Sequence, residues 1–261
     1  MKELLGQNWN ASKALKAVMI AQCAIAGLVV FSDMLQGTFS RSGATDREVQ
    51  TTEVPVTPGD QWRQFTPNRL PSAAPDAPEF RTDGAVPRRL EFEAVQIEGY
   101  GEALRITGTI AEGDAARFDE WLSARKAPPS IISLHSPGGL VWESLQIGRS
   151  IRAAELNTLV AAGDSCFSAC PYILAGGVQR DVSRRAFVGV HQHYFDENTY
   201  LPAFLLVADI QAGQGEVMAY LSDMGIDLLL MSKGMMTPPD DVYILVPDEL
   251  TTFAVATNLI D

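Results

Sequence analysis

Basic and metal-binding side chains are scarce in this chain of 261 residues. It holds 20 Lys and Arg against 32 Asp and Glu, which gives a formal net charge of -12. A nucleic-acid binder needs clustered positive charge to neutralise phosphates, so this balance argues against that class of protein. The three cysteines and three histidines lack the spacing of a zinc site, and we expect neither a metal nor another cofactor.

One apolar run, Ala17 to Phe31, lies near the N-terminus and follows Lys13 and Lys16. Its length falls between a signal-peptide core and a spanning helix of roughly 20 residues. The small-residue triplet Ala24 to Ala26 lies inside the run, so we expect an uncleaved single-pass anchor within residues 1–35, with cleavage as the alternative. The positive flank precedes the run, which predicts a bacterial inner-membrane protein whose remainder lies in the periplasm.

Residues 36–88 are polar and contain seven of the 15 prolines. They show no sustained hydrophobic period, which is typical of an extended tether rather than a packed domain. We therefore expect a disordered, Pro-rich linker between the membrane helix and a folded domain at 89–261. The prolines between residues 36 and 88 are Pro55, Pro58, Pro67, Pro71, Pro75, Pro78 and Pro87.

The region from residue 89 onward alternates strand and helix patterns. Apolar residues recur at period two over 104–110, at helical spacing over 115–125, and almost continuously over 131–134. This is a βαβ pattern and predicts an α/β domain with a mainly parallel sheet and right-handed crossovers. Further helices are expected at 140–154, 168–176, 202–225, 228–233 and from 247, and further strands at 158–162, 186–191 and 243–246.

Three short motifs fall where strands of this domain should end, the place where α/β folds bind ligands. They are the turn Ser136-Pro137-Gly138-Gly139, Ser168 among small residues, and His191. A serine hydroxyl needs a neighbouring base to become nucleophilic, and His191 could serve as that base. The N–H groups of Gly139, helped by Leu140, and of Ala169 could then bind a developing oxyanion.

Each motif also has a competing interpretation. Ser168 could be an ordinary helix N-cap, since serine is favoured there. Ser165 is a rival nucleophile and His193 a fallback base, whereas His135 is expected to order the glycine turn. Cysteines 166 and 170 flank Ser168, and regular helical geometry makes a bridge between them awkward unless the first lies outside the helix, so we expect free thiols.

The order and spacing of these motifs resemble those of the ClpP-type serine peptidases within the ClpP/crotonase superfamily. The resemblance covers roughly residues 100 to 261. It implies a repeated β-β-α superhelix, a Ser-His-Asp triad, and assembly into homo-oligomers. In that family an Asp shortly before the last strand completes the triad, which points to Asp241, with Asp240 as the alternative. The Lys base of related peptidases has a single candidate here, Lys233.

These expectations combine into a membrane-tethered serine peptidase that hydrolyses peptides or loosened protein chains outside the cytoplasm. Ser168 would attack, His191 would act as base, and Gly138, Gly139 and Ala169 would hold the substrate and the oxyanion. One alternative is a non-catalytic ClpP-like scaffold that binds peptide without cutting it. A crotonase-like acyl-thioester enzyme is a third possibility, and export from the CoA-rich cytoplasm argues against it.

Overall fold

The computed structural model describes residues 15–25, 27–28, 86–126, 128–193 and 203–261. The chain divides into two units, residues 1–46 and residues 47–261. In the first unit, residues 15–25 and 27–28 are helical with exposed side chains. In the described part of the chain, no helix combines the length and the apolar character needed to cross a membrane. The end of the predicted anchor, at residues 29–31, and the predicted linker up to residue 85 lie outside the described residues.

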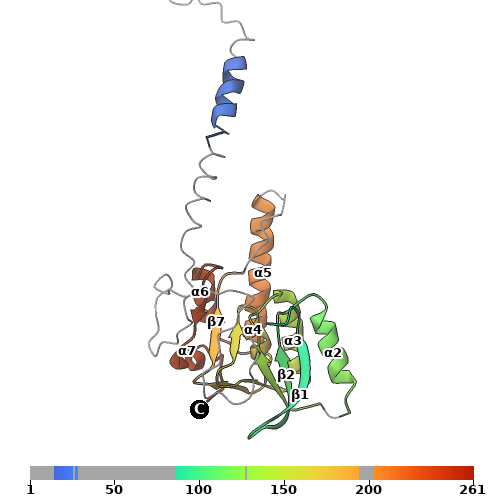
Figure 1. The fold of residues 1–261 in the computed structure, drawn as a ribbon. Coiled ribbons are helices and arrows are strands. Elements are labelled where there is room, and N and C mark those ends of the chain that lie inside the picture. The colour runs from blue at the N-terminus through green and yellow to red at the C-terminus, as the bar shows by residue number, and fades with distance from the viewer. Residues whose placement is uncertain (1–14, 26, 29–85, 127, 194–202) are drawn as a thin grey trace, which may run out of the picture. The chain divides into compact units, whose positions relative to one another are not determined.

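The second unit is built on a sheet of six strands, five of which run parallel to their neighbours (Figure 1). The first strand, β1, forms an antiparallel hairpin edge with β2. The strands of this sheet, in spatial order, are β1 (Glu91–Ile97), β2 (Gly101–Thr107), β3 (Ile131–His135), β4 (Asn157–Val160), β6 (Arg180–Ser183) and β9 (Asn258–Ile260).

A second, smaller sheet has three strands, and Ser168 and His191 directly follow two of them. Its middle strand, β7 (Phe187–Val190), is parallel to β5 (Ser165–Phe167) and antiparallel to β8 (Tyr243–Ile244). In the described part of the chain, a β-bridge between Ser136, just after β3, and Cys166 of β5 connects the two sheets. The residue that follows β3 is therefore fixed beside the strand that leads to Ser168.

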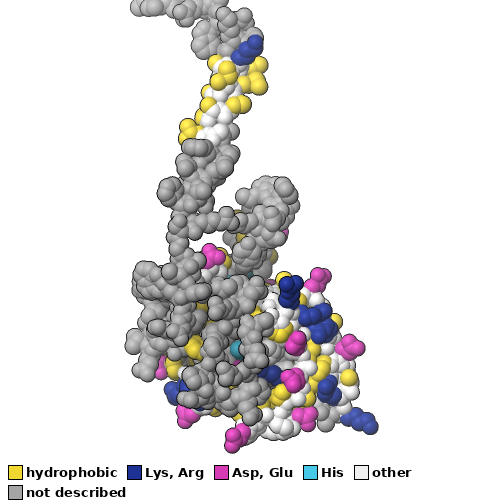
Figure 2. Space-filling model, in the orientation of Figure 1, with side chains coloured by type: hydrophobic (Ala, Val, Ile, Leu, Met, Phe, Trp, Pro, Cys, Tyr) yellow, Lys and Arg dark blue, Asp and Glu magenta, His cyan; other side chains and the backbone are white. Residues whose placement is uncertain are grey.

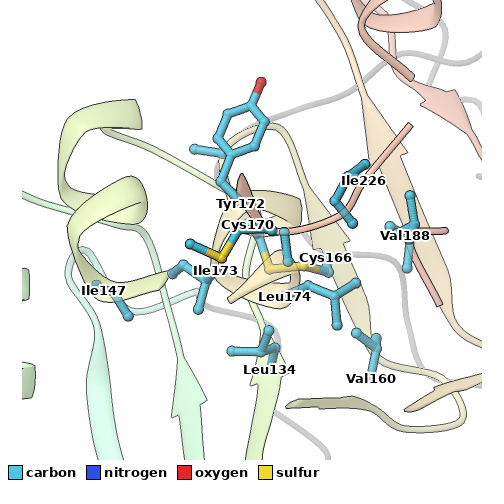
Figure 3. Close-up of a cluster of buried hydrophobic side chains, with 14 of the residues drawn as sticks. Leu134, Ile147, Val160, Cys166, Cys170, Tyr172, Ile173, Leu174, Val188 and Ile226 are labelled. Carbon is cyan, nitrogen blue, oxygen red and sulfur yellow. A yellow bond between two sulfur atoms is a disulfide. The ribbon is translucent and has the colours of Figure 1, made fainter. Parts of the chain in front are cut away.

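Helices connect the strands and supply the rest of the core. They are α2 (Asp114–Ser123), α3 (Val141–Ala153), α4 (Cys170–Ala175), α5 (Ala203–Asp223), α6 (Leu229–Met236) and α7 (Pro247–Thr252). Figure 3 shows the centre of the core, where Leu134, Ile147 and Val188 from different elements surround α4. Over the α2 side of the face seen in Figure 2, basic and acidic side chains are interspersed.

The predicted α/β class with a mainly parallel sheet is confirmed, and so is the βαβ unit, since β2 and β3 are parallel around α2. The strands form two sheets, because β5, β7 and β8 separate from the larger sheet. One expectation was wrong. Helix α4 begins at Cys170 instead of Ser168, because residues 165–167 form a strand that was not expected.

Candidate active site

The glycine turn after β3 is fixed by backbone hydrogen bonds on both sides. On one side the Ser136 N–H donates to the Ser165 carbonyl at 2.8 Å, and the Phe167 N–H donates to the Ser136 carbonyl at 3.0 Å. On the other side the Ile110 N–H donates to the Gly138 carbonyl at 2.8 Å. Gly138 has a φ of 100°, a conformation that side chains disfavour, which is why glycine is needed here.

Ser168 lies in a sharp turn between β5 and α4. Its φ is 60°, in the left-handed region that costs a non-glycine residue about 1–2 kcal/mol. The N-cap of α4 is Ala169, and no side chain caps this helix. The alternative that Ser168 is an ordinary helix cap is therefore ruled out. A strained serine placed before a helix is the kind of outlier that clusters at functional sites.

The backbone N–H groups of Gly139 and Ala169, like that of Cys170, donate to no acceptor among the described residues. By contrast, the Gly138 N–H donates to the Ser136 hydroxyl at 3.1 Å. The predicted help from Leu140 was wrong, because the Leu140 N–H donates to the Ile110 carbonyl at 3.0 Å. Gly139, in the glycine turn, and Ala169, directly after Ser168, thus each have a backbone donor available for a ligand.

His191 comes directly after β7, and the register of the small sheet brings it near Ser168. Phe167 pairs with Gly189, and the Ser168 N–H donates to the Gly189 carbonyl at 3.0 Å. Because parallel strands end at the same edge of a sheet, the residues that follow β5 and β7 share one side of it. Burial of the imidazole, and then the nearby His193, lower the pKa of His191 from 6.5 to about 4, whereas the Asp240 charge opposes that change.

The glycine turn, Ser168 and His191 all border one cavity of about 620 Å³. Ser168, His191, Gly138 and Gly139 all line it, and its volume is typical of a pocket for a small ligand or a peptide segment. Its apolar wall consists of Leu140, Val141, Trp142, Leu145 and Val217. The side chains of Leu140 and Trp142 are exposed, at 48% and 57%, so an apolar surface is presented to a ligand at this wall.

The two candidate acids are placed differently. Asp240 lines the cavity, and its charge raises the pKa of His191. Asp241 is not among the cavity-lining residues, and its N–H donates to the Pro238 carbonyl at 3.0 Å. The structure therefore brings Asp240 together with Ser168 and His191.

The rival nucleophile and the rival base have other surroundings. Ser165 is fully buried in β5 and does not line the cavity. His193 does line it, but its Nε2 lies 2.9 Å from the Tyr172 hydroxyl. Burial raises the pKa of Tyr172, so this hydroxyl stays protonated and keeps its hydrogen bond with Nε2. His191 is thus the better placed of the two histidines to accept a proton from Ser168.

His135 and Lys233 belong to other polar networks. The His135 Nδ1 accepts a hydrogen bond from the Ser165 N–H at 3.1 Å, beside the carboxylate of Asp164. Lys233 lies 3.1 Å from Glu249 and 3.0 Å from the Tyr243 hydroxyl, and it does not line the cavity. A lysine base therefore has no support in this arrangement.

The two cysteines around Ser168 form a disulfide, so the expectation of free thiols was wrong. The reason is that Cys166 lies in β5, outside the helix, and only Cys170 lies in α4. Among the described residues no group of three His, Cys, Asp or Glu is placed to hold a metal ion.

A buried ion pair between Arg105 and Asp164, which sequence patterns did not reveal, supports the strand next to the site. Arg105 of β2 donates to both carboxylate oxygens of Asp164, at 2.5 and 2.6 Å, and all of these groups are buried. Burial alone would raise the pKa of Asp164, but the hydrogen bonds from Arg105 hold it below its ordinary value. Asp164 directly precedes β5, so the pair anchors the strand that leads to Ser168. The available signal was an Arg directly between two apolar strand residues, Leu104 and Ile106.

Comparison with known proteins gives no match to this chain, either from a protein-family model or from a curated protein.

Proposed function

We propose that this protein is a serine peptidase of ClpP-like fold in which Ser168 is the nucleophile and His191 the general base. The observation that carries the proposal is the strained φ of Ser168 in a turn that lines the same cavity as His191 and the two glycines. A nucleophile, a base and spare N–H donors around one cavity are the parts that acyl transfer requires.

In the proposed reaction, the Ser168 oxygen attacks the carbonyl carbon of a peptide while the imidazole of His191 takes its proton. The negative charge on the carbonyl oxygen is bound by the N–H groups of Gly139 and Ala169. The imidazolium then returns the proton to the leaving amine, and a water hydrolyses the acyl ester by the same route. Asp240 is the proposed acid that stabilises the imidazolium, since it lines the cavity and Asp241 does not.

The composition of the cavity wall supports a peptide with apolar side chains as the substrate. Leu140 and Trp142 offer exposed apolar surface beside Ser168. The charged lining residues are Glu216 and Asp240, and no Lys or Arg occurs among the described residues of the lining. Neutral or basic peptides therefore suit this cavity better than acidic ones.

The order of elements supports the ClpP-like superhelix. In β4-β5-α4 and again in β6-β7-α5, two strands precede a helix. In both repeats the first strand joins the larger sheet and the second joins the smaller one. The disulfide supports placement outside the reducing cytoplasm, as proposed for a domain tethered in the periplasm by the N-terminal segment. Assembly into a homo-oligomer is part of the same proposal.

One observation favours the second candidate, a ClpP-like module that binds peptide without cutting it. A histidine with a pKa of about 4 is a weak general base, because proton acceptors work best when their pKa is near the working pH. In the peptidase the negative charge of Asp240 and the substrate must offset this weakness.

Fluorophosphonate labelling of the purified full-length chain separates the two candidates. An activated serine reacts covalently with the phosphonate, and mass spectrometry should place the adduct on Ser168. We expect Ser168→Ala and His191→Ala to abolish labelling and Ser165→Ala, at the rival nucleophile, to keep it in folded protein. A folded, oxidised native chain that takes up no label would overturn the peptidase and favour the binding module.

A further inference from the structure

The disulfide between Cys166 and Cys170 encloses Ser168, which is the middle residue of the bridged segment. Cys166 is the second residue of β5, and Cys170 is the first residue of α4. The bridge therefore ties the strand before the turn directly to the helix after it. Figure 3 shows the bridged pair among buried side chains that include Ile173, Leu174 and Val188, and both cysteines are fully buried.

The turn at Ser168 needs such support because its backbone is strained. A non-glycine residue keeps a φ of 60° only when its surroundings leave it no other choice. Two further contacts constrain it. The Ser168 N–H donates to the Gly189 carbonyl at 3.0 Å, and Gly138 packs against its side chain. Both contacts act from outside the turn, whereas the disulfide fixes the distance between its two ends.

We propose that the Cys166–Cys170 disulfide is a positioning element that holds the reactive conformation of Ser168, so that the chain reaches its full nucleophilic activity only after oxidation. This inference rests on the proposed function of Ser168. It implies that chain still in a reducing compartment carries a poorly reactive serine, and that oxidation of the two cysteines raises the reactivity of the site.

The oxidation step involves both cysteines and a protein disulfide as the oxidant. One thiolate attacks a sulfur of the oxidant and forms a mixed disulfide, and the second thiolate then displaces the oxidant as a dithiol. Two electrons and, in net terms, the two thiol protons pass to the oxidant, which is thereby reduced to the dithiol. Since both cysteines are fully buried in the folded chain, this exchange must occur before the segment packs into the core. Once formed, the buried bridge reacts with a reductant only when the chain around it opens locally, so its reduction is slow.

The size of the bridged segment argues that the effect is local. A disulfide stabilises a fold mainly by restricting the unfolded chain, and this restriction grows with the length of the loop it closes. Here the cysteines are only four positions apart, so the bridge restricts little of the unfolded chain. The disulfide instead spans the turn that contains the proposed nucleophile, Ser168.

The test compares the oxidised full-length chain with the double variant Cys166→Ala/Cys170→Ala. The matched control is Cys23→Ala, which removes the exposed free cysteine. For each protein we would measure the fluorophosphonate affinity, the maximal labelling rate and the thermal unfolding midpoint. We expect the maximal rate of the double variant to fall about 10- to 100-fold, as displacement of a reacting group by about 1 Å can do, with affinity changed less than about twofold. The control should behave as the native chain.

A merely structural disulfide would lower the unfolding midpoint and leave the labelling rate of the folded fraction unchanged, which would overturn the inference. If the double variant does not fold, native chain reduced stepwise gives the same information. Labelling should then fall in step with the appearance of two thiols while tryptophan fluorescence still reports folded protein, and full labelling of reduced, folded chain would contradict the proposal. A native oxidised chain without any label would instead overturn the proposed function itself.

Discussion

Gly138 lies directly against Ser168. A Cβ atom at Gly138 would approach the Ser168 Cβ to 2.5 Å and the Phe167 carbonyl oxygen to 2.6 Å. Contacts this short do not occur between real side chains, so the glycine turn and the strained serine must fit each other. The glycine is needed for the position of Ser168 as well as for its own backbone conformation.

Although Gly138→Ala adds only one methyl group, it should displace the side chain of Ser168. We expect a loss of about 1–3 kcal/mol in unfolding free energy from overpacking, and a drop in Ser168 labelling. Urea unfolding and phosphonate labelling would measure the two effects. The matched control is Gly215→Ala in α5, where an added Cβ has no atom within 4 Å, and which should leave both unchanged or slightly stabilise the helix. Normal labelling of Gly138→Ala would show that the contact does not position the serine.

Replacement of each candidate acid by its amide separates their roles. Asp240→Asn removes the charge that raises the pKa of His191, so we expect the labelling rate to fall at least about tenfold. Asp241→Asn, at a residue outside the cavity lining, should change it less than about twofold. The rates are measured at pH 7 with both proteins folded. The reverse order of effects would assign the acid to Asp241.

The buried His191 should make stability depend on pH. Its folded pKa of about 4 lies below the unfolded value of 6.5, so the unfolded chain takes up the proton first as pH falls. Stability is then complete above pH 6.5 and declines toward pH 4, by as much as about 3 kcal/mol from this residue. Burial also lowers the pKa of His193 and adds to the same trend.

Urea unfolding at intervals between pH 7 and pH 4 would measure this dependence. The matched variant is His191→Gln, which cannot titrate and should show a flatter profile. An unchanged profile in that variant would mean that His191 is not the buried group responsible.

Removal of one partner of the Arg105–Asp164 pair should be costly. Asp164→Asn leaves the buried Arg105 without its counter-charge, and we expect a loss of about 3–5 kcal/mol. The double variant Arg105→Met/Asp164→Leu should recover much of that loss, because it leaves no buried charge. Arg184→Ala, at the exposed pair with Asp261, is the control and should cost less than about 1 kcal/mol. If the double variant loses as much free energy of unfolding as Arg105→Met and Asp164→Leu lose together when made singly, the two groups are not coupled.

Local sequence patterns were informative wherever a segment is long enough to show the hydrophobic periodicity of a strand or a helix. The period-two pattern over 104–110 and the helical spacing over 115–125 predicted β2, α2 and the parallel pairing with β3. These patterns follow from which side chains must face the core, so they can be recognised without knowledge of the partners. Strand β5 has only three residues, Ser165–Phe167, which is too short for any period to be recognised.

For the candidate site too, some residues could be predicted from local sequence and others could not. Sequence alone selected Ser168, His191 and the turn at Gly138 and Gly139, because these residue types have few other reasons to follow strands in this order. Sequence could not decide between Asp240 and Asp241, because the direction in which each of two adjacent side chains points depends on the folded backbone.

The sequence by itself determined the α/β class and the motifs, because hydrophobic periodicity and turn chemistry are local properties. Only the tertiary structure decided the left-handed conformation of Ser168, the disulfide that encloses it and the cavity it shares with His191. Each of these depends on contacts between segments far apart in the chain, such as Gly138 against Ser168 and Gly189 bonded to its N–H. Such contacts are fixed when the two sheets pack together.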